Sequence, residues 1–126
     1  MCRITPKQAE DYVTIVYSHG NNEDLIDALG FASRLSKSIK AEFIVYDYSG
    51  YGDSKINSTT ESSICEDLEI ILSWVSQYRQ LEDIVLWGFS LGSYPTTVCS
   101  SHYNVLGVIL QAPFSSLLNI LNNPEE

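Results

Sequence analysis

The chain is poor in basic residues and contains no long apolar run. Seven lysines and arginines stand against sixteen acidic residues, which gives a net charge of −9 over 126 residues. Nucleic acid and anionic membrane surfaces bind basic patches, so we expect neither as a partner. No stretch has the length and apolar character of an integral membrane segment, and the polar N-terminus lacks the apolar core of a signal peptide.

Cysteine is also scarce. The three cysteines, Cys2, Cys65 and Cys99, are odd in number, lie far apart and form no Cys-x-x-Cys pair. This spacing disfavours a disulfide framework and a zinc site, so we expect no metal and a reducing, cytoplasmic location. No phosphate loop of the Gly-x-Gly-x-x-Gly or Gly-Lys-Ser type follows the first apolar run, so we expect no nucleotide and no other cofactor.

Apolar, β-branched runs alternate with stretches whose apolar residues recur every three or four positions. The first pattern predicts strands covered on both faces, and the second predicts helices with one buried side. The expected strands are 13–18, 42–46, 84–87 and 105–111, and the expected helices are 25–39, 64–75 and 91–101. This alternation predicts a single α/β domain over 1–126, with a three-layer α/β/α arrangement around a mostly parallel sheet.

Two element boundaries are less sharply marked. Residues 1–11 contain Pro6 and mixed charges, which is typical of an irregular lead-in or of the stub of an edge strand, and we expect little order before Tyr12. Either Thr60 or Ser63 can serve as the N-cap of the second helix, the latter with Glu66 completing a capping box.

The sequence Gly88-Phe89-Ser90-Leu91-Gly92 has the form Gly-x-Ser-x-Gly, after an expected strand and before an expected helix. A serine hydrolase needs its hydroxyl on a tight strand-to-helix turn, where the crowded backbone leaves room only for glycine two residues on either side. Ser90 is therefore the candidate nucleophile, and Gly88 and Gly92 form the elbow. The N–H of Leu91, at the start of the helix, is the first candidate donor to an oxyanion. The alternative is an ordinary turn with small residues for close packing.

Three further segments accompany this pentapeptide: Ser-His-Gly-Asn at 18–21, Asp-Tyr-Ser-Gly-Tyr-Gly at 47–52 and Leu-Gln-Ala-Pro-Phe at 110–114. Together they resemble the α/β-hydrolase superfamily, specifically the abhydrolase-domain serine hydrolases in the branch that includes protein depalmitoylases. The likeness covers nearly the whole chain. It implies that the expected strands are the family's third to sixth, in the spatial order 4-3-5-6.

The resemblance also implies roles for individual residues. Ser90 would be the nucleophile of a serine esterase or thioesterase that forms an acyl-enzyme with a small acyl ester or thioester substrate. The backbone N–H groups of Leu91 and Asn21 would form the oxyanion hole, and His19 and Gly20 would shape the turn that aims Asn21. The loop 47–52 would border the substrate entrance.

The chain departs from this family in the other two members of the catalytic triad, the acid and the histidine. In the family the acid and the catalytic histidine follow two further strands, and this sequence ends at Glu126 before either. His102 lies twelve residues beyond Ser90, roughly 18 Å along a helix at 1.5 Å per residue. His19 is expected beneath the oxyanion loop, where it cannot act as the base.

The aspartates at the two ends of the loop 47–53 do not replace the missing acid. Asp47 and Asp53 follow a different strand, and we expect them to order their loop in contact with solvent. The isolated chain should therefore lack a complete Ser-His-acid triad. Three readings stay open: a fragment of a longer enzyme, an inactive binding or interaction module, and a site completed by a second polypeptide.

The sequence also predicts an exposed edge. With the family's later strands absent, the apolar strand 105–111 would end the sheet unprotected, and we expect self-association or pairing with a partner chain there. Around the loop 47–52, the side chains of Tyr46, Tyr48 and Tyr51 could line an acyl pocket, or they could pack half-buried with a hydrated hydroxyl.

Overall fold

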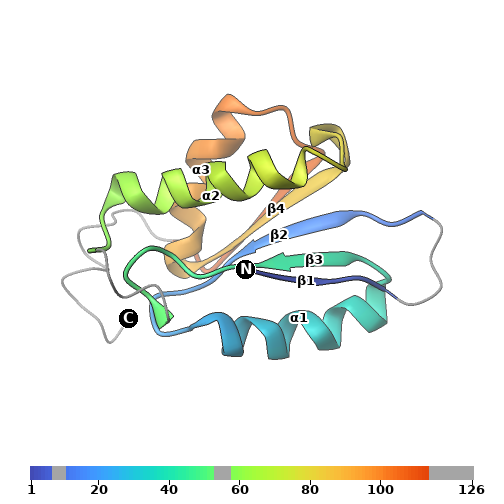
Figure 1. Cartoon of the computed structure of the whole chain (residues 1–126), viewed down its shortest axis with the longest axis horizontal. Helices are drawn as coiled ribbons and strands as arrows, with labels where there is room; N and C mark the ends of the chain where they lie inside the picture. Colours follow the sequence, from blue (N-terminus) through green and yellow to red (C-terminus); the bar gives the residue numbers. More distant parts are fainter. Residues whose placement is uncertain (7–10, 53–57, 114–126) are drawn as a thin grey trace.

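The computed structural model describes residues 1–6, 11–52 and 58–113, and it contains a five-stranded sheet between helices (Figure 1). The strands are β1 (Cys2–Ile4), β2 (Thr14–Ser18), β3 (Glu42–Val45), β4 (Ile84–Phe89) and β5 (Gly107–Gln111). The helices are α1 (Leu25–Ile39), α2 (Glu61–Val75) and α3 (Ser93–His102), with short 3-10 helices at Leu81–Asp83 and Ser90–Gly92.

The sheet order is β1-β3-β2-β4-β5. Strands β3, β2, β4 and β5 pair in parallel in this order, which confirms the order 4-3-5-6 predicted from the resemblance. Helix α1 covers one face of the sheet, and α2 and α3 cover the other (Figure 1). The predicted three-layer α/β/α fold is thereby confirmed.

The N-terminus corrects one expectation. Residues Cys2–Ile4 form β1, which pairs antiparallel with β3, so the expectation of little order before Tyr12 is wrong there and the edge-strand alternative is right. The Arg3 guanidinium Nε lies 2.7 Å from the buried carboxylate of Glu42, whose other oxygen accepts a hydrogen bond from Thr14 Oγ1 at 3.0 Å. This ion pair connects β1 to the rest of the sheet.

The helix termini follow ordinary capping chemistry. Asp24 caps α1 through hydrogen bonds from the N–H groups of Ile26 and Asp27. Thr60 caps α2, and Ser63 returns a side-chain contact to the Thr60 N–H, so Ser63 occupies the third helical position and is not the cap. Within the described residues, no helix combines the length and hydropathy needed to cross a membrane.

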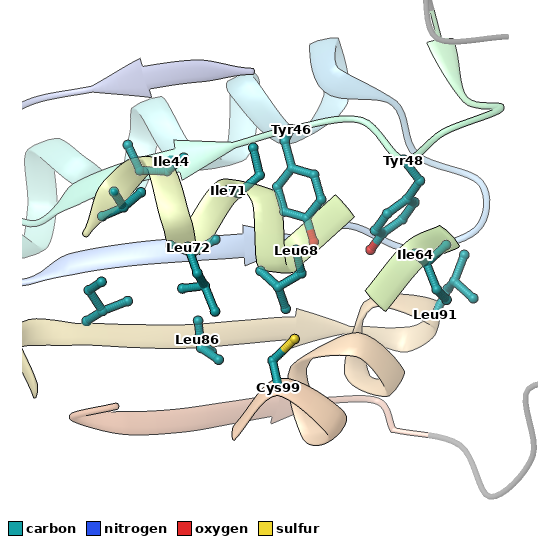
Figure 2. Close-up of a cluster of buried hydrophobic side chains, with 13 residues drawn as sticks. Ile44, Tyr46, Tyr48, Ile64, Leu68, Ile71, Leu72, Leu86, Leu91 and Cys99 are labelled. Carbon is teal, nitrogen blue, oxygen red and sulfur yellow. The ribbon is translucent and has the colours of Figure 1, made fainter. Parts of the chain in front are cut away.

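Two apolar clusters fill the spaces on either side of the sheet. The larger lies under α2 and α3 (Figure 2) and contains Val16, Ile44, Tyr46, Tyr48, Ile64, Leu68, Ile71, Leu72, Val75, Ile84, Leu86, Leu91 and Cys99. The smaller lies against α1 and contains Ile15, Tyr17, Ala28, Ala32, Ala41, Phe43 and Val45. Leu91, next to the candidate nucleophile, belongs to the larger cluster, so the elbow is anchored directly in the core.

The two cysteines of this helical layer are expected to react slowly. Burial raises the pKa of Cys65 to about 11 and that of Cys99 to about 12, so both are thiols at neutral pH. Thiolates are the reactive form, and we predict that at pH 8 iodoacetamide modifies Cys65 about a hundredfold more slowly than in the denatured chain, and Cys99 more slowly still. Peptide mass spectrometry over a time course measures this, and equal rates in folded and denatured chains would contradict it.

Candidate active site

The Gly-x-Ser-x-Gly segment forms a sharp strand-to-helix turn. Strand β4 ends at Phe89, a 3-10 helix runs over Ser90–Gly92, and α3 begins at Ser93. Ser90 has φ +49°, a left-handed conformation that non-glycine residues adopt rarely and that costs energy. Its side chain is only partly buried, whereas Leu91 and Gly92 are buried. The turn thus holds Ser90 in the strained geometry of a nucleophile elbow.

The two glycines of the elbow are required by close backbone contacts. A β-carbon added at Gly88 would overlap the carbonyl oxygen of Gly92. One added at Gly92 would overlap the carbonyl oxygen of Ser18, at the end of β2. Because the obstacles are backbone atoms, no side-chain movement can relieve them. The elbow therefore packs directly on itself and on the end of the neighbouring strand.

The turn after β2 lies beside this elbow. Strands β2 and β4 are neighbours, and Ser18 pairs with Gly88 in their register. A β-carbon added at Gly20 would lie 2.9 Å from the Phe89 ring, which places the loop 19–22 against the residue that precedes Ser90. The fold consequently brings together the segments that carry Asn21 and Leu91, the two candidate oxyanion donors.

The loop 47–52 holds the loop 19–22 in place. The Tyr48 hydroxyl donates to the His19 carbonyl oxygen at 2.6 Å, and the Tyr51 hydroxyl donates to Asn21 Oδ1 at 2.5 Å. The His19 ring contacts both tyrosine rings, with centroid separations of 4.4 Å to Tyr48 and 5.5 Å to Tyr51. Burial raises the pKa of both phenols, so they keep the hydrogens that they donate. Tyr46 and Tyr48 are fully buried, which favours packing over pocket lining for these two residues.

Neither histidine is placed to activate Ser90. The buried His19 ring has Nδ1 at 2.8 Å from the Gly20 carbonyl oxygen and Nε2 at 3.1 Å from Asp47 Oδ1, so both nitrogens face other groups. His102 is exposed at the end of α3, where Nδ1 lies 3.0 Å from the Val98 carbonyl oxygen. Across residues 1–6, 11–52 and 58–113, no cluster of three or more potential metal ligands occurs.

Asp47 differs from its predicted state. The prediction that it orders its loop agrees with its position beside His19, but its side chain is only 10% exposed, so the expected contact with solvent is largely absent. Asp53 lies outside the described residues. Asp67 on α2 has a similar ordering role, because its carboxylate accepts hydrogen bonds from the Ser49 N–H at 2.7 Å and from the Ser49 hydroxyl at 2.8 Å.

The buried tyrosines beside the site are expected to make the fold labile in alkali. Burial raises the pKa of Tyr46 and Tyr48 above the ordinary 10, so in the range above pH 10 the unfolded chain loses these protons while the folded chain keeps them. Their contribution to stability is complete below pH 10, and it decreases above it by about 1.4 kcal/mol per pH unit for each tyrosine.

Urea denaturation between pH 8 and pH 11 measures this dependence. The Tyr46→Phe variant removes one of the groups that titrate in this range, so its free energy of unfolding should fall less steeply with pH than that of the unaltered chain. A stability that stays constant from pH 9 to pH 11 would contradict the prediction.

Comparison with known proteins agrees with this geometry. The family model described as alpha/beta hydrolase fold matches residues 13–125. The chain belongs to the alpha/beta hydrolase fold family. The resemblance inferred from its motifs is thereby confirmed at the level of the superfamily. Among solved structures, MenH from S. aureus superposes on 96% of this chain and 46% of its own, with a TM-score of 0.69 and 19% identity, which shows the fold alone.

The curated relatives of this alpha/beta hydrolase are longer proteins. Alpha/beta hydrolase domain-containing protein 17C of Xenopus tropicalis is 34% identical over 111 residues, which is 85% of this chain and 35% of that protein. The human domain-containing protein 17B is 31% identical over 111 residues, again 85% of this chain and 38% of that protein. The chain thus spans little more than a third of the length of these relatives.

The sequence motifs predict the elbow but not the supports of the neighbouring loop. Asp47, Tyr48 and Tyr51 lie on the loop that is predicted to border the substrate entrance, and their side chains contact the loop that carries Asn21. The position of His19 at the end of one parallel strand and of Asp47 at the end of the adjacent strand was a usable signal, because the carboxyl ends of adjacent parallel strands lie side by side.

Proposed function

We propose that Ser90 is the nucleophile of a serine hydrolase of the esterase or thioesterase type. The observation that carries this proposal is the left-handed Ser90 on the turn between β4 and α3, beside the loop of Asn21. In our proposal the N–H groups of Leu91 and Asn21 form the oxyanion hole. Gly88 and Gly92 permit the turn, and His19 and Gly20 shape the Asn21 loop.

The proposed reaction has two steps. The Ser90 hydroxyl oxygen attacks the acyl carbonyl carbon, its proton passes to a general base, and the two N–H groups stabilise the negative carbonyl oxygen. The alcohol or thiol leaves with that proton, and Ser90 carries the acyl group. Water then attacks the acyl-enzyme, which releases the carboxylic acid and restores the hydroxyl. The substrate class is a small acyl ester or thioester.

In this proposal the general base for Ser90 comes from outside residues 1–126, because both histidines of the chain face other groups. The base is supplied either by a longer gene product or by a second polypeptide. The test is therefore a chimera, in which this chain replaces the part of the Xenopus tropicalis domain-containing protein 17C that it matches.

The chimera is mixed rapidly with a p-nitrophenyl ester. An acyl-enzyme predicts a burst of one p-nitrophenol per site before the steady state, and no burst for the Ser90→Ala variant. A folded, hydrolytic chimera whose burst survives in Ser90→Ala would contradict the role of Ser90.

A second candidate function follows from the same contacts of His19 and His102. With no base in its described part, the chain can act as a binding or interaction module that keeps the elbow only as structure. The two candidates differ in the chimera: a module predicts a folded chimera without hydrolysis. We also propose a cytoplasmic location, which the free cysteines Cys2, Cys65 and Cys99 support.

Strand β5 is the proposed site of self-association. It has a neighbour only on its β4 side within the described residues, and its apolar side chains Val108, Ile109 and Leu110 are each 40–42% exposed. Consecutive strand residues point to opposite faces, so both faces are open beside an unpaired edge. The strand is uncharged, and an antiparallel pairing with a second copy centred on Ile109 would place Val108 against Leu110.

Light scattering over a concentration series tests this pairing. We predict that the chain forms a dimer and that the Ile109→Lys variant is monomeric, because the two lysines at the centre of the pairing would repel each other. A chain that stays monomeric at high concentration would contradict the proposal. Exposed Ile70→Lys on α2 is the matched control and should leave the dimer intact.

A further inference from the structure

The peptide unit between Gly20 and Asn21 is held by its carbonyl group. The Gly20 oxygen faces His19 Nδ1 at 2.8 Å and accepts from the Glu23 N–H at 3.2 Å. A trans peptide is planar, and its N–H points opposite to its C=O. The groups that hold the Gly20 carbonyl therefore decide where the Asn21 N–H points, although they do not touch that N–H.

The preceding peptide is held in the same way. The His19 carbonyl accepts the Tyr48 hydroxyl at 2.6 Å, and the Gly20 N–H donates to Glu23 Oε2 at 2.8 Å. Contacts from Tyr48, in the loop after β3, and from Glu23, just before α1, thus help to fix two consecutive peptide planes. The Gly20 carbonyl oxygen has two contacts, one with the His19 ring and one with the Glu23 N–H, and the contact with the ring is the shorter.

The two nitrogens of the His19 ring face different groups. A carbonyl oxygen only accepts hydrogen bonds, so the short contact with Gly20 requires a hydrogen on Nδ1. Nε2 lies 3.1 Å from Asp47 Oδ1, within ion-pair distance, and both atoms are buried without a regular hydrogen bond. Asp47 is thus the group that faces the remaining ring nitrogen, and rotation of the ring would lose both contacts.

Gly52 keeps the Asp47 carboxylate in this position. Gly52 has φ +51°, and a β-carbon there would overlap Asp47 Oδ2. The backbone of the loop 47–52 consequently packs against the side of the carboxylate that faces away from His19. The His19 ring is fully buried and lies against the Tyr48 and Tyr51 rings, so its plane is also fixed.

We propose that Asp47 and His19 are positioning residues that orient the Gly20–Asn21 peptide. Asp47 holds the His19 ring, His19 Nδ1–H holds the Gly20 carbonyl, and the planar peptide turns the Asn21 N–H in the opposite direction. The catalytic consequence rests on the proposed function, in which this N–H binds the oxyanion. The Tyr51 hydroxyl, by contrast, holds the Asn21 side chain, and its removal in Tyr51→Phe provides the matched comparison.

The first experiment uses the unaltered chain labelled with ¹⁵N and ¹³C. NMR should show a hydrogen on His19 Nδ1 and a scalar coupling across the hydrogen bond to the Gly20 carbonyl carbon. In Asp47→Asn the side-chain amide can donate to Nε2, so Nδ1–H and the coupling should persist. In Asp47→Ala the coupling should be lost and the Asn21 amide resonance should move. A His19 Nδ1 without hydrogen in the unaltered chain would overturn the proposal.

The second experiment measures hydrolysis by the chimera described above. Asp47→Ala should lower kcat by about tenfold with little change in KM, because an oxyanion donor acts in the transition state and Glu23 N–H still holds part of the loop. Asp47→Asn should restore most of the rate, and Tyr51→Phe should have a smaller effect. If Asp47→Ala does not fold, Asp47→Ser is used instead, because the serine hydroxyl is too short to reach His19 Nε2 as the carboxylate does.

The two proposals fail in different ways. If the NMR results are as expected but the folded chimera is inactive, the orientation of the peptide is correct and the proposed function is wrong. If the chimera is active and Asp47→Ala changes neither kcat nor the Asn21 amide, the function stands and the positioning role is overturned.

Discussion

Replacement of Gly92 by alanine is expected to lower the free energy of unfolding by about 3 kcal/mol or more. The added methyl group would overlap the carbonyl oxygen of Ser18, which is itself part of the ladder between β2 and β4. Relief requires the elbow to move away from β2, which would also disturb Leu91 in the core. Urea denaturation followed by circular dichroism measures the change.

Gly30→Ala is the matched control for this substitution. Gly30 lies within α1, and the nearest atom to an added β-carbon is the flexible end of Arg34 at 3.7 Å. Alanine favours a helix interior over glycine, so this variant should be as stable as the unaltered chain or up to about 1 kcal/mol more stable. A Gly92→Ala variant that loses less than about 1 kcal/mol would show that the elbow is not packed as described.

The second large effect concerns turnover. We expect the 126-residue chain to hydrolyse p-nitrophenyl esters at least about 10⁴-fold more slowly than the chimera, because a serine without a base is a poor nucleophile. Ser90→Ala in the chimera should cause a loss of similar size, since residues of a triad act as a unit. The same substitution in the chain alone should change its small residual rate little.

Steady-state rates on the same ester, corrected for spontaneous hydrolysis, test this prediction. His102→Ala in the chain provides the control, because the exposed His102 makes its ring contact with Val98 and should have no role in the residual rate. A chain whose rate is within tenfold of the chimera would mean that a base for Ser90 lies within residues 1–126.

The fold could be predicted because several signals agreed. The β-branched runs of the strands and the three- and four-residue repeats of the helices are local patterns, and the Gly-x-Ser-x-Gly segment fixed which strand end matters. The left-handed Ser90 and the crowded Gly88 and Gly92 are as expected from that motif. The short strand β1 could not be predicted firmly, because three residues carry almost no periodicity.

The supports of the candidate site could not be predicted in the same way. The contact of Asp47 with His19 joins residues 28 positions apart, and no local pattern distinguishes a buried aspartate from a solvated one. The sequence could not decide between Thr60 and Ser63 as the N-cap, because each of them has a residue three positions later that can complete a capping box. The start of α2 at Glu61 identifies Thr60 as the cap.

The intact mass of the protein after treatment with a fluorophosphonate probe tests the role of Ser90 most directly. We predict that the chimera gains one adduct on the peptide that contains Ser90, that its Ser90→Ala variant gains none, and that the 126-residue chain alone stays unlabelled at the same probe concentration. A folded chimera that is not labelled at Ser90, or specific labelling of Ser90 in the chain alone, would contradict this prediction.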